Sequence, residues 1–156
     1  MLLKDNPNAN TQFNPSGGGN DYEGSLLQSA MTAYYTGTIQ QSSPTLYANA
    51  VIPILNGSAQ SAISTPTATM AKGNIQEKDV CFALSYQEAL EMTGYITASP
   101  LRAYSNTWWL RTMLESGQNA CGVSSSGYIY GSVIPVSDSF ALRPAIWVKT
   151  YTLVFI

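Results

Sequence analysis

The chain has 156 residues, with seven Lys or Arg, nine Asp or Glu and no His, so its formal net charge is −2. This length fits one domain, and we expect residues 1–156 to form it. The cations are scattered and the apolar runs fall short of the ~18 residues of a membrane span, which argues against a nucleic-acid partner and against membrane insertion.

Charged residues make up only 10% of the chain, against about 25% in typical soluble domains. Ser, Thr, Asn, Gln, Gly and ten Tyr take their place. Such a surface is typical of extracellular and virion proteins, and also of subunits that bury much of their outside against neighbours. We therefore expect the protein to be extracellular or on a cell or virion surface.

The first third of the chain predicts a loop followed by two helices. Residues 1–20 are loop-rich, since Asn, Pro and Gly dominate from residue 5. The capping-box spacing of Ser25 and Gln28 predicts a helix over 26–35, which we expect Gly37 to end. A second short helix is predicted from Pro44 to about residue 50.

The middle of the chain predicts an irregular stretch and then a strand–helix unit. An Asn-Gly turn at 56–57 opens a region rich in Ser, Thr and Ala that runs to residue 73. Residues 79–84 are typical of a strand. Ser85 then caps a helix with Glu88 as its capping-box partner, the last strand residue can pack on Ala89, and Gly94 ends the helix.

From residue 107 to 156 the pattern is rich in β-strand. The turn at 125–127 joins two segments into a hairpin, and Pro144 suggests an edge strand or a bulge. The predicted strands are 107–111, 119–124, 127–133, 141–148 and 150–156. Helices first and short antiparallel strands last indicate an α+β domain.

Four segments together resemble a large bacterial family of unknown function with a C-type-lectin-like core, related in fold to formylglycine-generating enzymes and to phage tropism determinants. They are residues 22–28, 79–85, 108–112 (Trp-Trp-Leu-Arg-Thr) and 142–146 (Leu-Arg-Pro-Ala-Ile). The resemblance implies a C-type-lectin-like fold, with two helices packed on a small twisted antiparallel sheet. Gln28 replaces the family's usual Arg, and Thr112-Met113 replaces Ser-Pro.

The residues do not favour catalysis. Without His the commonest general base is missing, and the chain has no nucleophile elbow, phosphate loop or dinucleotide fingerprint. Glu88 and Glu91 are interpreted as a solvated helix face. We expect no enzyme activity, no cofactor and no metal site. An enzyme of the formylglycine-generating branch is a distant alternative, because no recognisable counterpart of that branch's cysteine motif is present.

Two cysteines leave two interpretations open. Cys81 and Cys121 are either buried thiols that act as small apolar residues, or a disulfide that joins two strands.

The tryptophans and two arginines are interpreted as structural. Trp108 and Trp109 are consecutive, so in a strand they face opposite ways, and we expect core packing for both and for Trp147. Arg111 and Arg143 lie in the resembling segments, and a buried Arg needs partners. These partners would be backbone carbonyls or carboxylates such as Asp138; a ligand contact is the alternative role.

The hairpin is the best candidate binding surface. Residues 124–132 are rich in Tyr, Ser and Gly, the residue types that serve antibody paratopes. A plain solvated hairpin with cross-strand Tyr pairs is the alternative. The candidate ligand-binding residues are Ser124, Ser125, Tyr128, Tyr130 and Asp138.

These observations favour a non-catalytic extracellular recognition module that binds a protein or glycan on a surface. The alternative is a structural subunit of an extracellular fibre, pilus or virion. Members of the resembling family have an N-terminal strand with no counterpart here, so the chain would be a fragment or a partner would fill the gap. The uncharged residues 150–156 could then join subunits into an oligomer or polymer by strand addition.

Overall fold

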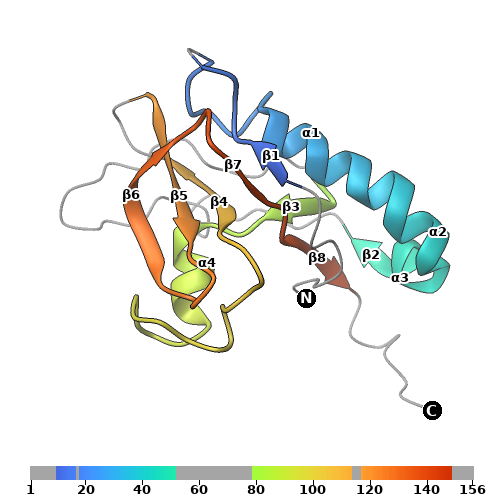
Figure 1. Ribbon diagram of the computed structural model, residues 1–156. Coiled ribbons are helices and arrows are strands. Elements are labelled where there is room, and N and C mark those ends of the chain that lie inside the picture. Colours follow the sequence, from blue (N-terminus) through green and yellow to red (C-terminus); the bar gives the residue numbers. More distant parts are fainter. Residues whose placement is uncertain (1–9, 17, 52–78, 114–116, 149–156) are drawn as a thin grey trace.

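A helical arm lies beside two small sheets in the computed structural model of the chain (Figure 1). The structure describes residues 10–16, 18–51, 79–113 and 117–148. The predicted turn at 56–57, the irregular stretch to residue 73 and the strand over 150–156 lie outside these residues. The α+β class is confirmed.

The larger sheet has five strands in the order β1-β7-β4-β5-β6. All of its pairs are antiparallel except β4 with β7, which is parallel. Its strands are β1 (Asn10–Gln12), β4 (Trp108–Met113), β5 (Asn119–Val123), β6 (Ile129–Pro135) and β7 (Ser139–Ala141). The loop predicted for the N-terminal segment therefore contains a short strand, which pairs with β7 and is followed by the fully buried Phe13.

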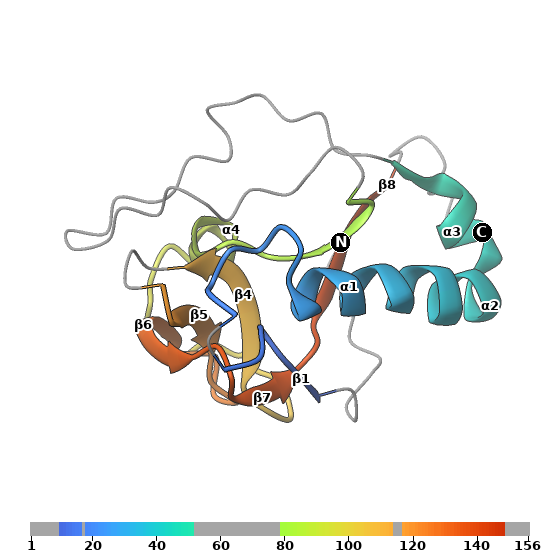
Figure 2. The same cartoon turned by 90° about the horizontal axis from the view of Figure 1, so that it is seen from above.

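The smaller sheet has three antiparallel strands in the order β2-β8-β3. They are β2 (Ala50–Val51), β3 (Cys81–Ala83) and β8 (Pro144–Val148). Its strand β3 contacts both β4 of the larger sheet and the helical arm, and Figure 2 shows the arm extending away from the larger sheet. One small antiparallel sheet was predicted, whereas the structure has two sheets and one parallel pair.

The predicted strand 141–148 is in fact two strands in different sheets. Its break falls after Ala141, where β7 ends, and Pro144 begins β8. Pro144 pairs with Ala83, and β8 is the central strand of its sheet. The edge or bulge predicted for this proline is wrong. The first position of a strand also tolerates Pro.

The helical arm consists of α1 (Leu26–Ala33), a π-helical segment η1 (Tyr34–Ile39), α2 (Gln40–Ser42) and α3 (Pro44–Asn49). The Ser25 hydroxyl accepts a hydrogen bond from the Gln28 backbone N–H, at 3.0 Å, and so caps α1 as predicted. The Gln28 side chain does not complete a capping box on Ser25, because its Oε1 accepts from the Gly24 N–H at 2.8 Å. Pro44 begins α3, which confirms the second helix.

Gly37 does not end the first helix, contrary to the prediction. A glycine inside a helix costs about 1 kcal/mol, which burial on either side of it can offset. Tyr34 and Ile39 are buried in the same core, and the i→i+5 pattern of a π-helix brings residues five apart toward one face. The helix therefore continues to Ser42.

The strand–helix unit predicted after residue 79 is confirmed. Helix α4 (Tyr86–Glu91) follows β3, and both halves of the Ser85–Glu88 capping box are present. Gly94 takes a φ of 75°, and its N–H donates to the Leu90 carbonyl, as in a glycine-terminated helix.

The core consists of two clusters, one on each face of β4. Trp108 and Trp109 are both fully buried and belong to different clusters, as their alternation predicts. Trp109 makes edge-on contacts with Phe13 and Phe140, with ring centroids at 5.8 and 5.0 Å. Trp147 is 54% exposed, so its predicted place in the core is wrong. It follows the buried Ile146 on β8. Because successive side chains of a strand face opposite ways, the Trp147 side chain points away from the core.

Candidate recognition surface

Two predicted ligand-binding tyrosines stand side by side at the start of β6: Tyr128 precedes the strand and Tyr130 belongs to it. Strand alternation buries Ile129 and exposes its neighbours Tyr128 and Tyr130, each by 38%. Their rings meet edge to face, with centroids 5.3 Å apart and planes at 67°. This arrangement presents both aromatic surface and phenol hydroxyls to a partner.

Ser124 and Ser125 differ in their surroundings. Ser124 is buried, and its hydroxyl accepts from the Tyr128 N–H at 3.0 Å and shares a hydrogen bond with the Ser126 hydroxyl. It therefore shapes the hairpin turn and is not placed to contact a ligand, contrary to the expectation. Ser125 is exposed, and its carbonyl accepts from the Tyr104 N–H.

Asp138 is not part of this surface. It is exposed in the turn after β6, at the opposite end of the strand from Tyr128. Since a strand rises about 3.3 Å per residue, the separation is on the order of 20 Å. The arginines that were expected to use Asp138 have other partners.

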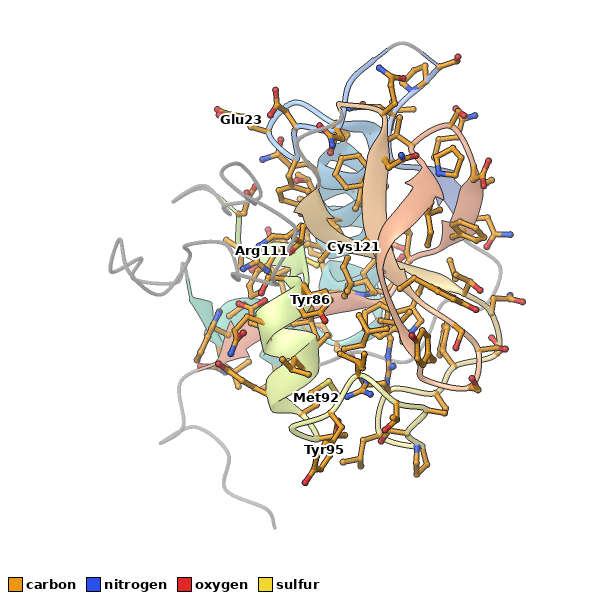
Figure 3. All side chains as sticks on the ribbon, turned by 90° about the vertical axis from the view of Figure 1, so that its left-hand side faces the viewer. Glu23, Tyr86, Met92, Tyr95, Arg111 and Cys121 are labelled. Atoms are coloured by element: carbon orange, nitrogen blue, oxygen red, sulfur yellow. The ribbon has the colours of Figure 1, made fainter. Side chains whose placement is uncertain are left out.

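The loop between α4 and β4 completes the surface, and the sequence reasoning missed it. Tyr95, Ile96 and Leu101 are exposed by 72%, 41% and 60%. Figure 3 shows Tyr95 at the outer end of this loop, beyond Met92, with Tyr86 and Cys121 deeper in the molecule. The apolar residues after Gly94 follow neither a helix nor a strand period, so no pattern in the sequence marked them as part of a surface.

Backbone hydrogen bonds join this loop to the hairpin. The Ser99 N–H donates to the Ser126 carbonyl, and the Ile129 N–H donates to the Ile96 carbonyl. Gly127 has a φ of 86°, and a Cβ there would lie 2.1 Å from the Ser99 carbonyl oxygen. Only glycine therefore allows the loop and the turn to approach so closely. We define the recognition surface as Tyr95, Ile96, Leu101, Ser125, Tyr128 and Tyr130.

Arg102, which the sequence reasoning also missed, lies beneath the recognition surface and is fully buried. Its Nε donates to the Gly127 carbonyl at 2.9 Å, and its Nη1 donates to the Ala89 carbonyl and the Thr93 hydroxyl. Its Nη2 donates to the Thr97 carbonyl. One side chain thus links α4, the loop and the hairpin turn.

Arg143 supports the same loop from the other side. Its two terminal nitrogens donate to the carbonyls of Arg102, at 2.6 Å, and Leu101, at 3.3 Å. Its guanidinium lies 4.8 Å from the Trp108 ring centroid and 5.6 Å from that of Tyr104. These contacts are structural, to backbone carbonyls and rings.

Arg111 binds a carboxylate in a different place. It donates to both Glu88 oxygens and, at 2.7 Å, to the Ala83 carbonyl. Burial opposes ionisation of Glu88, but the hydrogen bonds and charge of Arg111 and the hydrogen bonds from Ser85 outweigh it and lower the Glu88 pKa. Glu88 is therefore an ion-paired capping residue, which corrects its interpretation as part of a solvated face; Glu91 is exposed.

The two cysteines are buried free thiols, so the disulfide alternative is wrong. Cys81 and Cys121 belong to different core clusters. Burial raises the pKa of each thiol to about 12, which keeps both protonated near neutral pH. The Cys121 Sγ donates to the Gly131 carbonyl.

Away from the recognition surface, a concavity of about 550 Å³ runs along α1 and η1. Ser29, Thr32 and Thr36 line it, and each of their hydroxyls donates to the carbonyl one turn earlier. At its base the Gln28 Nε2 donates to both carboxylate oxygens of Asp79, at 3.0 Å. Gln28 thus holds the segment that leads into β3.

Within the described ranges, no group of three or more Cys, Asp or Glu side chains is arranged to hold a metal ion. No helix in that part of the chain is long and apolar enough to cross a membrane. Comparisons with protein-family models, curated proteins and solved structures found no match for this chain.

Proposed function

We propose that this chain is a non-catalytic recognition module that binds a protein or glycan on a surface through the recognition surface. One observation carries the proposal. Backbone hydrogen bonds connect the hairpin, with its exposed edge-to-face tyrosine pair, to the apolar loop between α4 and β4. Tyr and Ser on a rigid support give a large amphipathic contact area at a low cost in conformational entropy.

The chemistry of the polar residues supports a non-catalytic role. Both thiols are buried and protonated, and Glu88 is engaged by Arg111. The phenols of Tyr128 and Tyr130 have no described general base beside them. We propose an extracellular, cell-surface or virion-surface location, which the 10% content of charged residues supports.

We also propose a C-type-lectin-like fold. In its support, the segments that carry the resemblance lie together: Arg111 of β4 binds β3 and α4, and Arg143, just before β8, packs on Trp108 of β4. Strand addition by residues 150–156 stays an alternative, and no described contact favours it.

The test is binding of fluorescently labelled protein to arrays of immobilised glycans and of cell-surface proteins. The wild type should bind a small set of spots, and the Tyr128→Ser/Tyr130→Ser variant should lose at least about tenfold in affinity, as expected for aromatic hot spots. Leu26→Ser is the matched control, because Leu26 is also exposed, by 42%, but lies on α1. Equal binding by the tyrosine variant would refute the proposal.

A further inference from the structure

Exposed apolar side chains concentrate in the recognition surface. Seven large hydrophobic side chains are exposed in the described part of the chain, and five of them belong to this surface. The other two of these seven, Leu26 and Trp147, lie elsewhere. Clustered exposed apolar residues on a folded domain mark an interaction site, whereas single ones do not.

The segments that form the surface present no charge. Residues 92–110 contain one ionisable cation or carboxylate, the fully buried Arg102, and residues 117–136 contain none. A partner with a charged face would lose hydration there without gaining an ion pair, which is unfavourable. The surface therefore fits an uncharged, apolar partner.

Two aliphatic side chains favour a protein over a glycan. Leu101 and Ile96 form no hydrogen bonds through their side chains and have no π-face for a sugar ring. Their exposed area is best removed from water by other apolar side chains. Tyrosines with aliphatic neighbours and few charges are also the composition of the buried centre of protein interfaces.

We expect side chains to make the contact, because the start of the neighbouring sheet edge is already bonded and the edge is irregular. β6 is the edge of its sheet, but its Ile129 N–H is already bonded to Ile96. Its register with β5 also shifts between the pairs Gly122–Tyr130 and Ala120–Ile134. Irregular pairing of this kind protects edge strands.

We propose that the partner is a second copy of this chain, bound surface to surface about a two-fold axis. A two-fold contact pairs each patch with itself, so the partner must have the chemistry of the patch. An uncharged apolar patch meets this condition, because two copies face each other without like-charge repulsion despite the net charge of −2. The proposal rests on the proposed recognition role of the surface.

The test is sedimentation velocity of the full chain from about 1 µM to about 1 mM, the range in which weak to moderate dissociation constants fall. We expect a reversible monomer–dimer equilibrium. The Leu101→Ser/Tyr130→Ser variant should raise the dimer dissociation constant at least about tenfold, and Leu26→Ser should leave it unchanged. Far-UV circular dichroism and thermal melting of each variant show whether the fold is retained.

Salt gives a second measurement that needs no variant. The dimer should persist between about 0.1 M and about 1 M NaCl, although the Debye length falls from about 10 Å to about 3 Å. Dissociation by salt would overturn the inference, and so would a chain that stays monomeric at the highest concentration. A monomer whose array binding is lost in Tyr128→Ser/Tyr130→Ser would keep the recognition role and assign the surface to another occupant.

Discussion

The Arg102 guanidinium links helix α4, the loop that follows it and the hairpin turn. It bonds the end of α4 through Ala89, the loop through Thr97 and the hairpin turn through Gly127. Its own carbonyl accepts from the Trp108 indole and from Arg143. The planar fork of an arginine can reach these acceptors together, and a lysine ammonium cannot.

Replacing Arg102 by Lys should therefore loosen the recognition surface. We expect a loss of about 2–4 kcal/mol in the free energy of unfolding, since the ammonium cannot reach all of these buried carbonyls and leaves some of them without a donor. Urea unfolding measures this loss. Hydrogen exchange should rise in residues 93–104 and 124–128 more than elsewhere.

Arg111→Lys is the matched control for this prediction, because Arg111 is also a buried arginine that bonds a backbone carbonyl. Its exchange should rise around β3 and α4 instead. The same exchange pattern in both variants would contradict a local role for Arg102.

At the scale of elements, the helices and strands that could be predicted are those determined by residues close together in the sequence. The Ser85–Glu88 capping box and Gly94 define α4 within ten residues, and the alternation of Trp108 and Trp109 defines the two faces of β4. The helix beyond Gly37 could not be predicted, because burial of Ile39 depends on the core that it joins.

The candidate site was predictable only on its hairpin side. The Tyr and Ser content of residues 124–132 indicated a surface, but the loop after Gly94 has no period that marks it. Arg102 was missed because a buried arginine differs from an exposed one only in its tertiary partners, such as Gly127 and Ala89. Asp138 was wrongly included, because it follows β6 and therefore lies at the end of the strand away from the hairpin turn.

The close contact between the hairpin turn and the loop predicts a large effect of Gly127→Ala. A left-handed φ costs a non-glycine residue about 1–2 kcal/mol, and the clash with the Ser99 carbonyl adds to this cost. We expect a loss clearly above 2 kcal/mol in urea unfolding, because backbone on both sides must move.

Gly24→Ala separates the cost of the left-handed φ from the cost of the clash. Gly24 has a similar φ, 78°, but nothing lies within 4 Å of the position of its Cβ. This variant should lose only about 1–2 kcal/mol, the backbone cost alone. Equal losses at Gly24 and Gly127 would show that the loop does not pack against the turn.

At the scale of the whole molecule, two core clusters share one strand. β4 buries Trp109 in the cluster with α1 and β3, and Trp108 in the cluster with α4 and β6. Leu84 packs against both clusters, and its carbonyl accepts from the Arg111 N–H of β4. Neither cluster can open without exposing one face of this strand.

We therefore expect both clusters to unfold in one transition, as in a single domain. The exposed Trp147 can be replaced by Phe at little cost, which leaves one tryptophan as a reporter in each cluster. In this background, Trp108→Phe leaves Trp109 to report on one cluster, and Trp109→Phe leaves Trp108 to report on the other. Each core substitution should lower stability, but within each variant the urea midpoints from fluorescence and from far-UV circular dichroism should coincide. Separate midpoints in either variant would show that the chain contains two units that unfold independently, and that the shared strand and Leu84 do not couple them.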